Sequence, residues 1–103
     1  MAGPAAPVLE PDVDVGERTS LAPPWRVVLH DDPGTTMEFV VELLVSVFGK
    51  PPVEAVRLML EVHHGGSAVV AVCPQERAEL YVEQVVSLAR PRGFPLAATA
   101  EPA

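Results

Sequence analysis

The sequence predicts a small α+β domain in which a three-stranded antiparallel sheet packs against three helices, in the order βααβαβ. Two short runs, WRVVLH and SAVVAVC, have the length and the β-branched residues of strands. Three other segments carry apolar residues at helical spacing between prolines and glycines. At 103 residues the chain forms at most one domain. A sheet of only three strands is most simply buried when helices cover one of its sides.

Residues 1–24 precede the predicted domain and are expected to form a flexible N-terminal extension. They contain five prolines, several acidic residues and no hydrophobic periodicity. The opening also lacks the basic and apolar regions of a signal peptide, and the later apolar runs are too short to span a membrane. We therefore expect a soluble, cytoplasmic protein. The first strand, residues 25–30, ends at the turn-forming stretch Asp31-Asp32-Pro33-Gly34.

Two helices are expected after this turn. Thr35 is predicted to cap the first helix, with Glu38 as its reciprocal partner three residues on, and Gly49 to end it. The apolar face predicted for this helix comprises Met37, Val40, Val41, Leu44, Val47 and Phe48. The second helix should begin near Pro51-Pro52, because proline is tolerated in a first turn, and end at Gly65-Gly66. The residues predicted to share one face of it are Val56, Met59, Leu60 and His63.

The remaining elements complete the predicted order. SAVVAVC, residues 67–73, is a strand by residue type, and Pro74 opens a third helix. The buried stripe predicted for this helix comprises Ala78, Val82, Val85 and Ala89. Prolines and a glycine between residues 91 and 95 stop the helix, and PLAATAE forms a short, weak strand. The sequence contains no internal repeat.

The acidic composition limits the classes of partner. The chain has 14 Asp and Glu residues against 7 Lys and Arg residues, a formal net charge of −7 and a pI of about 4.7. The phosphate backbone of DNA or RNA would therefore be repelled, whereas cations, amines and basic protein surfaces would be attracted. The single cysteine, Cys73, excludes an internal disulfide.

Asp31 and Asp32 are the first candidates for a functional role, and two interpretations of them are open. In the simpler one they hold a turn and favour the positive end of the following helix, as most aspartates before a helix do. In the other they form a trap for a cation at the end of a strand. An α-amino group suits such a trap, because it is mostly charged at neutral pH and offers three hydrogen-bond donors.

His63 is the second candidate. It is either an ordinary histidine at the edge of the core or a rim residue whose neutral imidazole accepts a hydrogen bond. His64 points about 100 degrees away on the helix and is expected to be exposed. If the strand end and both helices converge, Asp31, Asp32 and His63 would surround an opening. Its apolar walls would then be Met37, Val40, Met59 and Val62, although methionines at such positions are ordinarily core residues.

Catalytic and metal chemistry find little support in the sequence. His30, His63, Asp31 and Asp32 could ligate zinc or manganese, but no His-x-x-His or His-x-x-x-His spacing accompanies them. Cys73 and Ser46 have no obvious base nearby in the sequence, and no glycine-rich phosphate loop is present. We therefore expect no catalytic residue, metal or cofactor.

Two segments resemble the ClpS adaptor family. Its members show a strand, then Asn-Asp-Asp, a Thr-Pro-Met-Glu-Phe-Val helix start and a Met-Leu-x-Val-His-x-x-Gly helix end. The strongest match is MLEVHHGG, residues 59–66, and MEFVV, residues 37–41, supports it independently. The likeness runs without an obvious gap from Trp25 to Glu101. The resemblance therefore implies a ClpS-like core domain over residues 25–103.

The resemblance implies an adaptor that binds the N-terminal Leu, Phe, Tyr or Trp of N-degron substrates. Such adaptors deliver their substrates to a AAA+ Clp unfoldase that is paired with the ClpP protease. By this likeness, Asp31, Asp32 and His63 would hold the substrate's α-amino group and first peptide unit, and Met37 would act as a gate. The walls of the side-chain pocket would be Val40, Met59, Val62 and Leu96.

The resemblance also implies a docking surface and a delivery device. Glu76 and Tyr81 lie on the helix that would contact the N-terminal domain of the unfoldase, and the extension before Trp25 would engage its pore. Nothing in the sequence calls for more than a monomer, and we expect neither nucleic acid nor a membrane as a partner.

The sequence departs from the family pattern in four places, one of them a pair of residues. Asp31 replaces the usual asparagine, so it accepts from an amine but cannot donate to a carbonyl as an amide would. Pro33-Gly34 and Thr36 alter the loop, which leaves the choice among hydrophobic N-terminal residues open. Tyr81 stands where a lysine is common, which leaves the docking surface less defined.

Two other functions remain open from the sequence. One is a diverged member that modulates a Clp unfoldase without reading N-termini. The other is a small acidic hydrolase that uses Asp31, Asp32 and His63. A peptide whose N-terminus is acetylated separates the adaptor from the modulator, because acetylation removes the cation and leaves the side chain.

Overall fold

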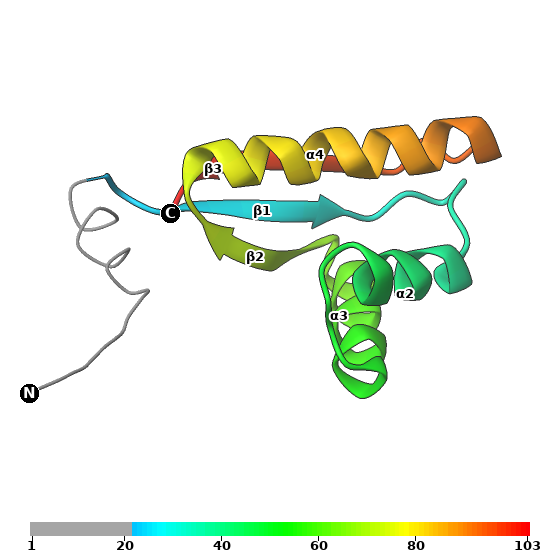
Figure 1. The fold of residues 1–103 in the computed structure, drawn as a ribbon. Coiled ribbons are helices and arrows are strands. Elements are labelled where there is room, and N and C mark those ends of the chain that lie inside the picture. The colour runs from blue at the N-terminus through cyan, green and yellow to red at the C-terminus, as the bar shows by residue number, and fades with distance from the viewer. Residues whose placement is uncertain (1–21) are drawn as a thin grey trace, which may run out of the picture.

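The computed structural model describes residues 22–103 and confirms the predicted order βααβαβ (Figure 1). Most of the extension expected over residues 1–24 lies outside the described residues. The described elements are β1 (Trp25–His30), α2 (Met37–Ser46), α3 (Pro52–Gly65), β2 (Ser67–Cys73), α4 (Gln75–Ala89), the 3₁₀ helix η2 (Arg90–Arg92) and β3 (Ala97–Pro102). No helix within residues 22–103 is long and apolar enough to cross a membrane.

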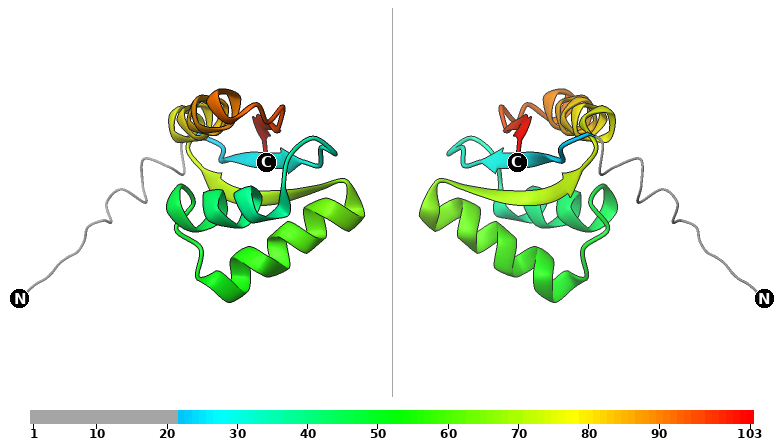
Figure 2. Two further views of the ribbon diagram at one scale, coloured as in Figure 1. Left: turned by 90° about the vertical axis from the view of Figure 1, so that its right-hand side faces the viewer. Right: turned by 90° about the vertical axis from the view of Figure 1, so that its left-hand side faces the viewer.

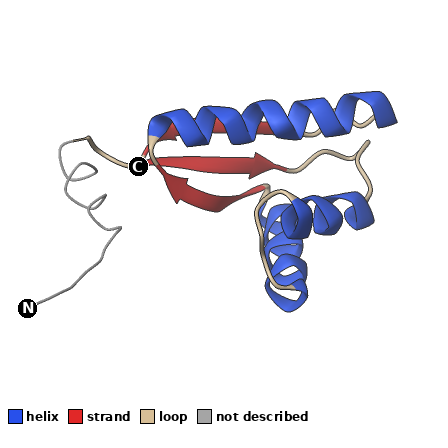
Figure 3. Ribbon diagram, viewed as in Figure 1, coloured by secondary structure: helices blue, strands red, loops and turns tan. Residues whose placement is uncertain are grey.

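The sheet has the strand order β2-β1-β3, and both pairings are antiparallel (Figure 3). Leu29 in the central strand lies opposite Ala68 on one side and Ala98 on the other, and all three are buried. The next residue toward the N-terminus, Val28, pairs with Val69, whose exposed fraction is 42%. Because successive side chains point to opposite faces, one face of the sheet packs in the core. The other, the open sheet face, carries exposed side chains such as that of Val69, although Val28 itself is only 8% exposed.

All three helices pack on the buried face of the sheet. Val27 and Leu29 belong to a single core cluster that also contains Leu44 of α2, Leu58 of α3 and Val85 of α4. Helix α4 lies along β1 and β3, whereas α2 and α3 lie together near β2 (Figures 1 and 2). The end of β1 and the two shorter helices therefore share one end of the domain.

Helix α2 begins one residue later than the predicted cap implied. Thr36, not Thr35, is the N-cap, and its hydroxyl accepts a hydrogen bond from the backbone N–H of Phe39 at 3.2 Å. The predicted cap was wrong because Thr35 belongs to the preceding turn. The predicted apolar face was also partly wrong, because Met37 is 44% exposed. The buried residues of α2 are Phe39, Val40, Leu43 and Leu44.

Helix α3 confirms the predicted ends but not the predicted face. Its first residue is Pro52, and Gly66 closes it at φ 93°, a left-handed conformation that suits glycine. The buried residues are Ala55, Leu58 and Val62. The predicted face of Val56, Met59, Leu60 and His63 is therefore rotated by about one residue, or 100°. Met59 and His63 instead lie at the boundary of the core, where they are open to a pocket.

The C-terminal part follows the prediction closely. Ala78, Val85 and Ala89 of α4 are buried and Val82 is partly buried. The weak final strand is present as β3, which begins at Ala97. The guanidinium of Arg90 donates to the carbonyl oxygens of Phe94 and Leu96, at 2.8 and 2.9 Å, and so fixes the connection between α4 and β3.

Candidate functional site

The loop between β1 and α2 carries the predicted aspartates to the C-terminal end of α3. The backbone N–H of Asp31 donates to the carbonyl of Gly66 at 2.9 Å. Gly66 is the residue that closes α3, and His63 lies in the last turn of that helix. This backbone hydrogen bond therefore places the end of β1 beside the histidine, although the two segments are more than 30 residues apart in the sequence.

Asp31 and His63 face each other at this junction. Oδ1 of Asp31 is 3.7 Å from Nδ1 of His63, which is an ion-pair distance if the imidazole is protonated but is too long for a hydrogen bond. The two side chains are 37% and 44% exposed, respectively. The ring of His64 lies against that of His63, with 5.1 Å between the centroids. Both side chains are therefore accessible to a ligand that arrives from solvent.

Asp32 is held more tightly than Asp31. Its Oδ2 atom accepts from the backbone N–H of Gly34 at 2.8 Å and from the hydroxyl of Thr35 at 3.1 Å. The backbone N–H of Thr35 also donates to the carbonyl of Asp32 at 3.2 Å. Asp32 thus stabilises the turn, as the simpler sequence interpretation proposed, and its carboxylate also lines a pocket.

The pocket opens between this loop, the start of α2 and the end of α3. It is lined by Asp31, Asp32, Pro33, Thr35, Thr36, Met37, Glu38, Met59, Val62 and His63. The structure thus brings together most of the residues predicted for amine and side-chain binding. Val40 and Leu96 are not among the lining residues, because they are 6% and 1% exposed within the core cluster.

Sequence reasoning missed Pro33, Thr35, Thr36 and Glu38 as lining residues. Pro33 and the two threonines follow the aspartates within the same turn, and Glu38 lies in the first turn of α2. An Asp followed within three residues by Gly and Thr is a pattern in which the carboxylate accepts from the turn, so this pattern could have identified Thr35.

The pocket combines negative charge at its rim with apolar side chains. Three carboxylates line it, from Asp31, Asp32 and Glu38, and no lysine or arginine is among the lining residues. The apolar lining residues include the half-buried Met59 and the buried Val62. A ligand that carries a cation beside an apolar group would satisfy both parts of this surface.

The described residues give little support to metal binding or to thiol chemistry. Within the part of the chain that the structure describes, no three His, Cys, Asp or Glu side chains gather closely enough to hold a metal ion. Burial raises the pKa of the Cys73 thiol, with a smaller opposing effect of Arg77. Because the thiolate is the nucleophilic form, a raised pKa disfavours reaction at neutral pH. Cys73 ends β2 and is not among the pocket residues.

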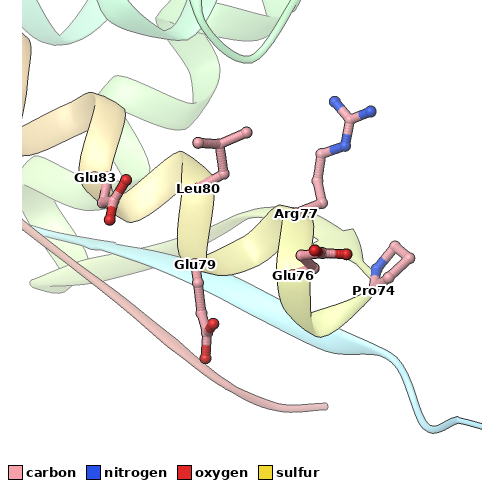
Figure 4. A pocket seen from close by; sticks show the side chains of 6 residues that line it. All are labelled: Pro74, Glu76, Arg77, Glu79, Leu80 and Glu83. Atoms are coloured by element: carbon pink, nitrogen blue, oxygen red, sulfur yellow. The ribbon is translucent and has the colours of Figure 1, made fainter.

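A second surface lies along the first turns of α4. A shallow depression there is lined by Pro74, Glu76, Arg77, Glu79, Leu80 and Glu83 (Figure 4). Glu76, one of the two predicted unfoldase contacts, is therefore exposed on this surface. Tyr81, the other, is half-buried and packs on Phe48, with 4.6 Å between the ring centroids. The two residues are thus on the same helix but in different surroundings.

Comparisons with known proteins agree on one family. The family model ClpS, described as ATP-dependent Clp protease adaptor protein ClpS, matches residues 20–99. A protein of that name from Desulforapulum autotrophicum is 45% identical over 87 residues, which is 84% of each chain. Another, from Desulfatibacillum aliphaticivorans, is 49% identical over 78 residues, 76% of this chain and 75% of that one.

A solved structure extends the similarity to three dimensions. The structure of Agrobacterium tumefaciens ClpS2 bound to L-phenylalaninamide matches this fold with a TM-score of 0.76 and 37% sequence identity. The match covers 79% of this chain and 98% of the ClpS2 chain.

Proposed function

The chain belongs to the ClpS family of Clp protease adaptors, and from this premise we propose that it binds the exposed N-terminal residue of N-degron substrates. We propose further that it delivers these substrates to a AAA+ Clp unfoldase paired with ClpP. Leu, Phe, Tyr and Trp are the N-terminal residues expected to bind. The chain itself would perform no catalysis, and its contribution would be recognition.

The observation that carries this proposal is the carboxylate-rimmed pocket. L-phenylalaninamide, the ligand of the ClpS2 structure, has a free α-amino group and an apolar side chain on one carbon atom. The pocket of this chain offers carboxylates and apolar side chains within one opening. An N-terminal hydrophobic residue carries the same two groups, and an internal residue has no ammonium group.

The size of the binding free energy favours a requirement for both an ammonium group and an apolar side chain. Burying a Leu or Phe side chain contributes about 1.5 to 3 kcal/mol, whereas micromolar affinity requires about 8 kcal/mol. Hydrogen bonds to a charged group contribute about 1.5 to 3 kcal/mol each. Several charge-assisted bonds to the ammonium group are therefore needed in addition to the side chain. A blocked or internal residue would lose most of the affinity.

We assign the α-amino group and the first peptide unit to Asp31, Asp32 and His63. Met37 would restrict which N-terminal side chains fit into the pocket. Its exposed position among the lining residues supports this role. Met59 and Val62 would contact that side chain directly. Val40 and Leu96 would lie beneath these residues and form the floor of the pocket, which would require the lining side chains to move when a large residue enters.

We assign contact with the N-terminal domain of the unfoldase to α4. Glu76 is exposed there, and Glu79 and Glu83 continue the acidic surface around Leu80. Such a surface suits a partner that offers basic groups around an apolar patch. Tyr81 would contribute by holding α4 against Phe48, with its exposed edge available to the partner.

The proposal is tested by fluorescence-anisotropy titration of the full chain with labelled peptides that begin with Leu or Phe. Free peptides should bind with micromolar or tighter affinity. The same peptides with an acetylated N-terminus should bind at least about a hundredfold more weakly, because two or more charge-assisted bonds are lost. Equal affinity for free and acetylated peptides would overturn N-terminal recognition and favour the modulator of an unfoldase.

A further inference from the structure

We infer that Thr35 is a positioning residue that orients the Asp32 carboxylate for the ligand's α-amino group. This inference rests on the proposed function. The resemblance to the family assigned no function to Thr35. This residue is also not one of the three residues assigned to the amine, although it lies beside them. Its hydroxyl acts on the ligand through Asp32.

The two oxygens of the Asp32 carboxylate have different surroundings. Oδ2 accepts two hydrogen bonds from the turn, from the N–H of Gly34 and from the hydroxyl of Thr35. Within residues 22–103, Oδ1 takes part in no hydrogen bond or ion pair of the protein. A carboxylate has about four acceptor positions, so Oδ1 remains available for an ammonium group while Oδ2 holds the side chain still.

The ends of the loop that carries Asp32 are held by hydrogen bonds that do not involve the Thr35 hydroxyl. The N–H of Asp31 is bonded to Gly66, and Thr36 begins α2 as its N-cap. Removal of the Thr35 hydroxyl therefore leaves both ends of the loop attached to α3 and α2. We therefore expect the change to be confined to the Asp32 side chain, which keeps only its hydrogen bond from the backbone N–H of Gly34.

The neighbouring aspartate provides a contrast. Asp31 is 3.7 Å from His63 and forms no side-chain hydrogen bond among the described residues, so its rotamer is set less strictly than that of Asp32. A group that is already held in its binding orientation loses less conformational entropy when the ligand arrives. Asp32 should therefore provide the preorganised contact with the amine, whereas Asp31 adapts to the ligand.

Thr35 is a better position for a test than Gly34, although both donate to Oδ2. A Cβ atom at Gly34 would lie 3.2 Å from that same oxygen and 3.2 Å from Cδ of Pro95, so any substitution there displaces Asp32 or Pro95 directly. Thr35→Val replaces the hydroxyl with a methyl group and retains the shape of the side chain. Thr35→Ser keeps the donor and removes only a methyl group.

The experiment measures peptide affinity by anisotropy for the wild-type chain, Thr35→Val and Thr35→Ser. Each protein is titrated with a Leu-initiated peptide in free and acetylated form. We expect Thr35→Val to weaken the free peptide about five- to twentyfold, and Thr35→Ser to stay within about twofold of wild type. Affinity for the acetylated peptide should change little, because that peptide makes no contact through an ammonium group. Thr99→Val, which removes a hydroxyl bonded to His30 on the open sheet face, is the matched control and should bind as wild type does.

A double-mutant cycle with Asp32→Ala separates positioning from a direct contact. Titrations of the Asp32→Ala variants extend to millimolar concentrations, because their affinity is low. In this background, Thr35→Val should change the affinity for the free peptide by less than twofold. The same loss in both backgrounds would overturn the inference, because Thr35 would then act on the ligand without Asp32. Wild-type affinity in Thr35→Val, or an equal loss in Thr35→Ser, would also overturn it. Failure of the wild-type chain to distinguish free from acetylated peptide would overturn the proposed function, and the positioning role with it.

Discussion

The pocket and the α4 surface are both acidic and both contain exposed apolar side chains, but they are built differently. The pocket residues come from a loop and from two helices, and hydrogen bonds such as that of Asp31 to Gly66 hold these elements together. The acidic residues of α4 lie along one helix at spacings of three and four residues. Among them, Glu79 accepts an intrahelical hydrogen bond from Gln75 at 3.1 Å.

This difference predicts how selective each surface is. A pocket whose groups converge from several elements fixes their relative positions, so it can require two features of one small ligand at the same time. A row of glutamates on a helix surface presents a broad negative field that suits a large partner. Substitutions in the pocket should therefore have larger effects than substitutions of single residues on α4.

The largest effect is expected from Asp32→Ala. Loss of the carboxylate removes a charge-assisted hydrogen bond, so affinity for a free Leu-initiated peptide should fall about 10- to 150-fold, as measured by anisotropy. Binding to the isolated N-terminal domain of a Clp unfoldase should be unchanged, because Asp32 is remote from α4 in sequence and lines the other surface. A parallel loss in both assays would show that the two regions are not independent.

A second effect is expected from pH. The α-amino group of a peptide has an ordinary pKa of about 7.7 to 8, and the carboxylates of the pocket bind its charged form. Affinity should therefore be full below this range and should fall about tenfold between pH 7 and pH 9. Circular dichroism of the free protein over the same pH range provides the control, because it shows whether the protein stays folded. Affinity for the ordinary peptide that stays constant up to pH 9 would contradict ammonium recognition.

A third, smaller effect concerns the contribution of the two loop threonines to the stability of the fold. Thr36→Ala removes the N-cap of α2 and should lower the free energy of unfolding by about 1 kcal/mol in urea denaturation. Thr35→Ala removes no cap and should lower it less. A larger loss of stability in Thr35→Ala than in Thr36→Ala would indicate that Thr35 is the N-cap, as the sequence predicted.

The smallest effect is expected from one residue of α4. Glu76→Gln should weaken binding to the unfoldase domain by about fivefold or less, because an exposed charge contributes at most about 1 kcal/mol. The loss should shrink further at high salt, and peptide affinity should stay the same. Glu101→Gln, on the open sheet face, is a control of equal charge change. A larger loss of peptide affinity than of unfoldase affinity would contradict the separation of the two surfaces.

The fold could largely be predicted from the sequence because its strands are marked by residue type. WRVVLH and SAVVAVC coincide with β1 and β2, and the glycine pair after α3 marks its end. The faces of α2 and α3 were harder, because both helices carry apolar residues on more than one side. Val56 and Leu60 fit a helical stripe, yet tertiary packing buries Ala55 and Leu58 instead.

The site was predictable where chemistry alone marks the residue. Asp31, Asp32 and His63 are polar side chains at the ends of elements, and the structure brings all three to one opening. Thr35 was misassigned because its hydroxyl can serve either a helix cap or a turn, and only the position of Asp32 decides between them. Whether Val40 lines the pocket or lies in the core depends on the rotation of α2 about its axis. The spacing of apolar residues in the sequence does not determine this rotation.

Recognition of an N-terminal residue requires that one pocket bind both an ammonium group and an apolar side chain of the same residue. Isothermal titration calorimetry with three small ligands, L-phenylalaninamide, N-acetyl-L-phenylalaninamide and glycinamide, tests it most directly. We expect measurable binding of L-phenylalaninamide and no detectable binding of the other two, since each lacks one of the required groups. Equal affinity for the acetylated and the free compound would show that the ammonium group is not recognised.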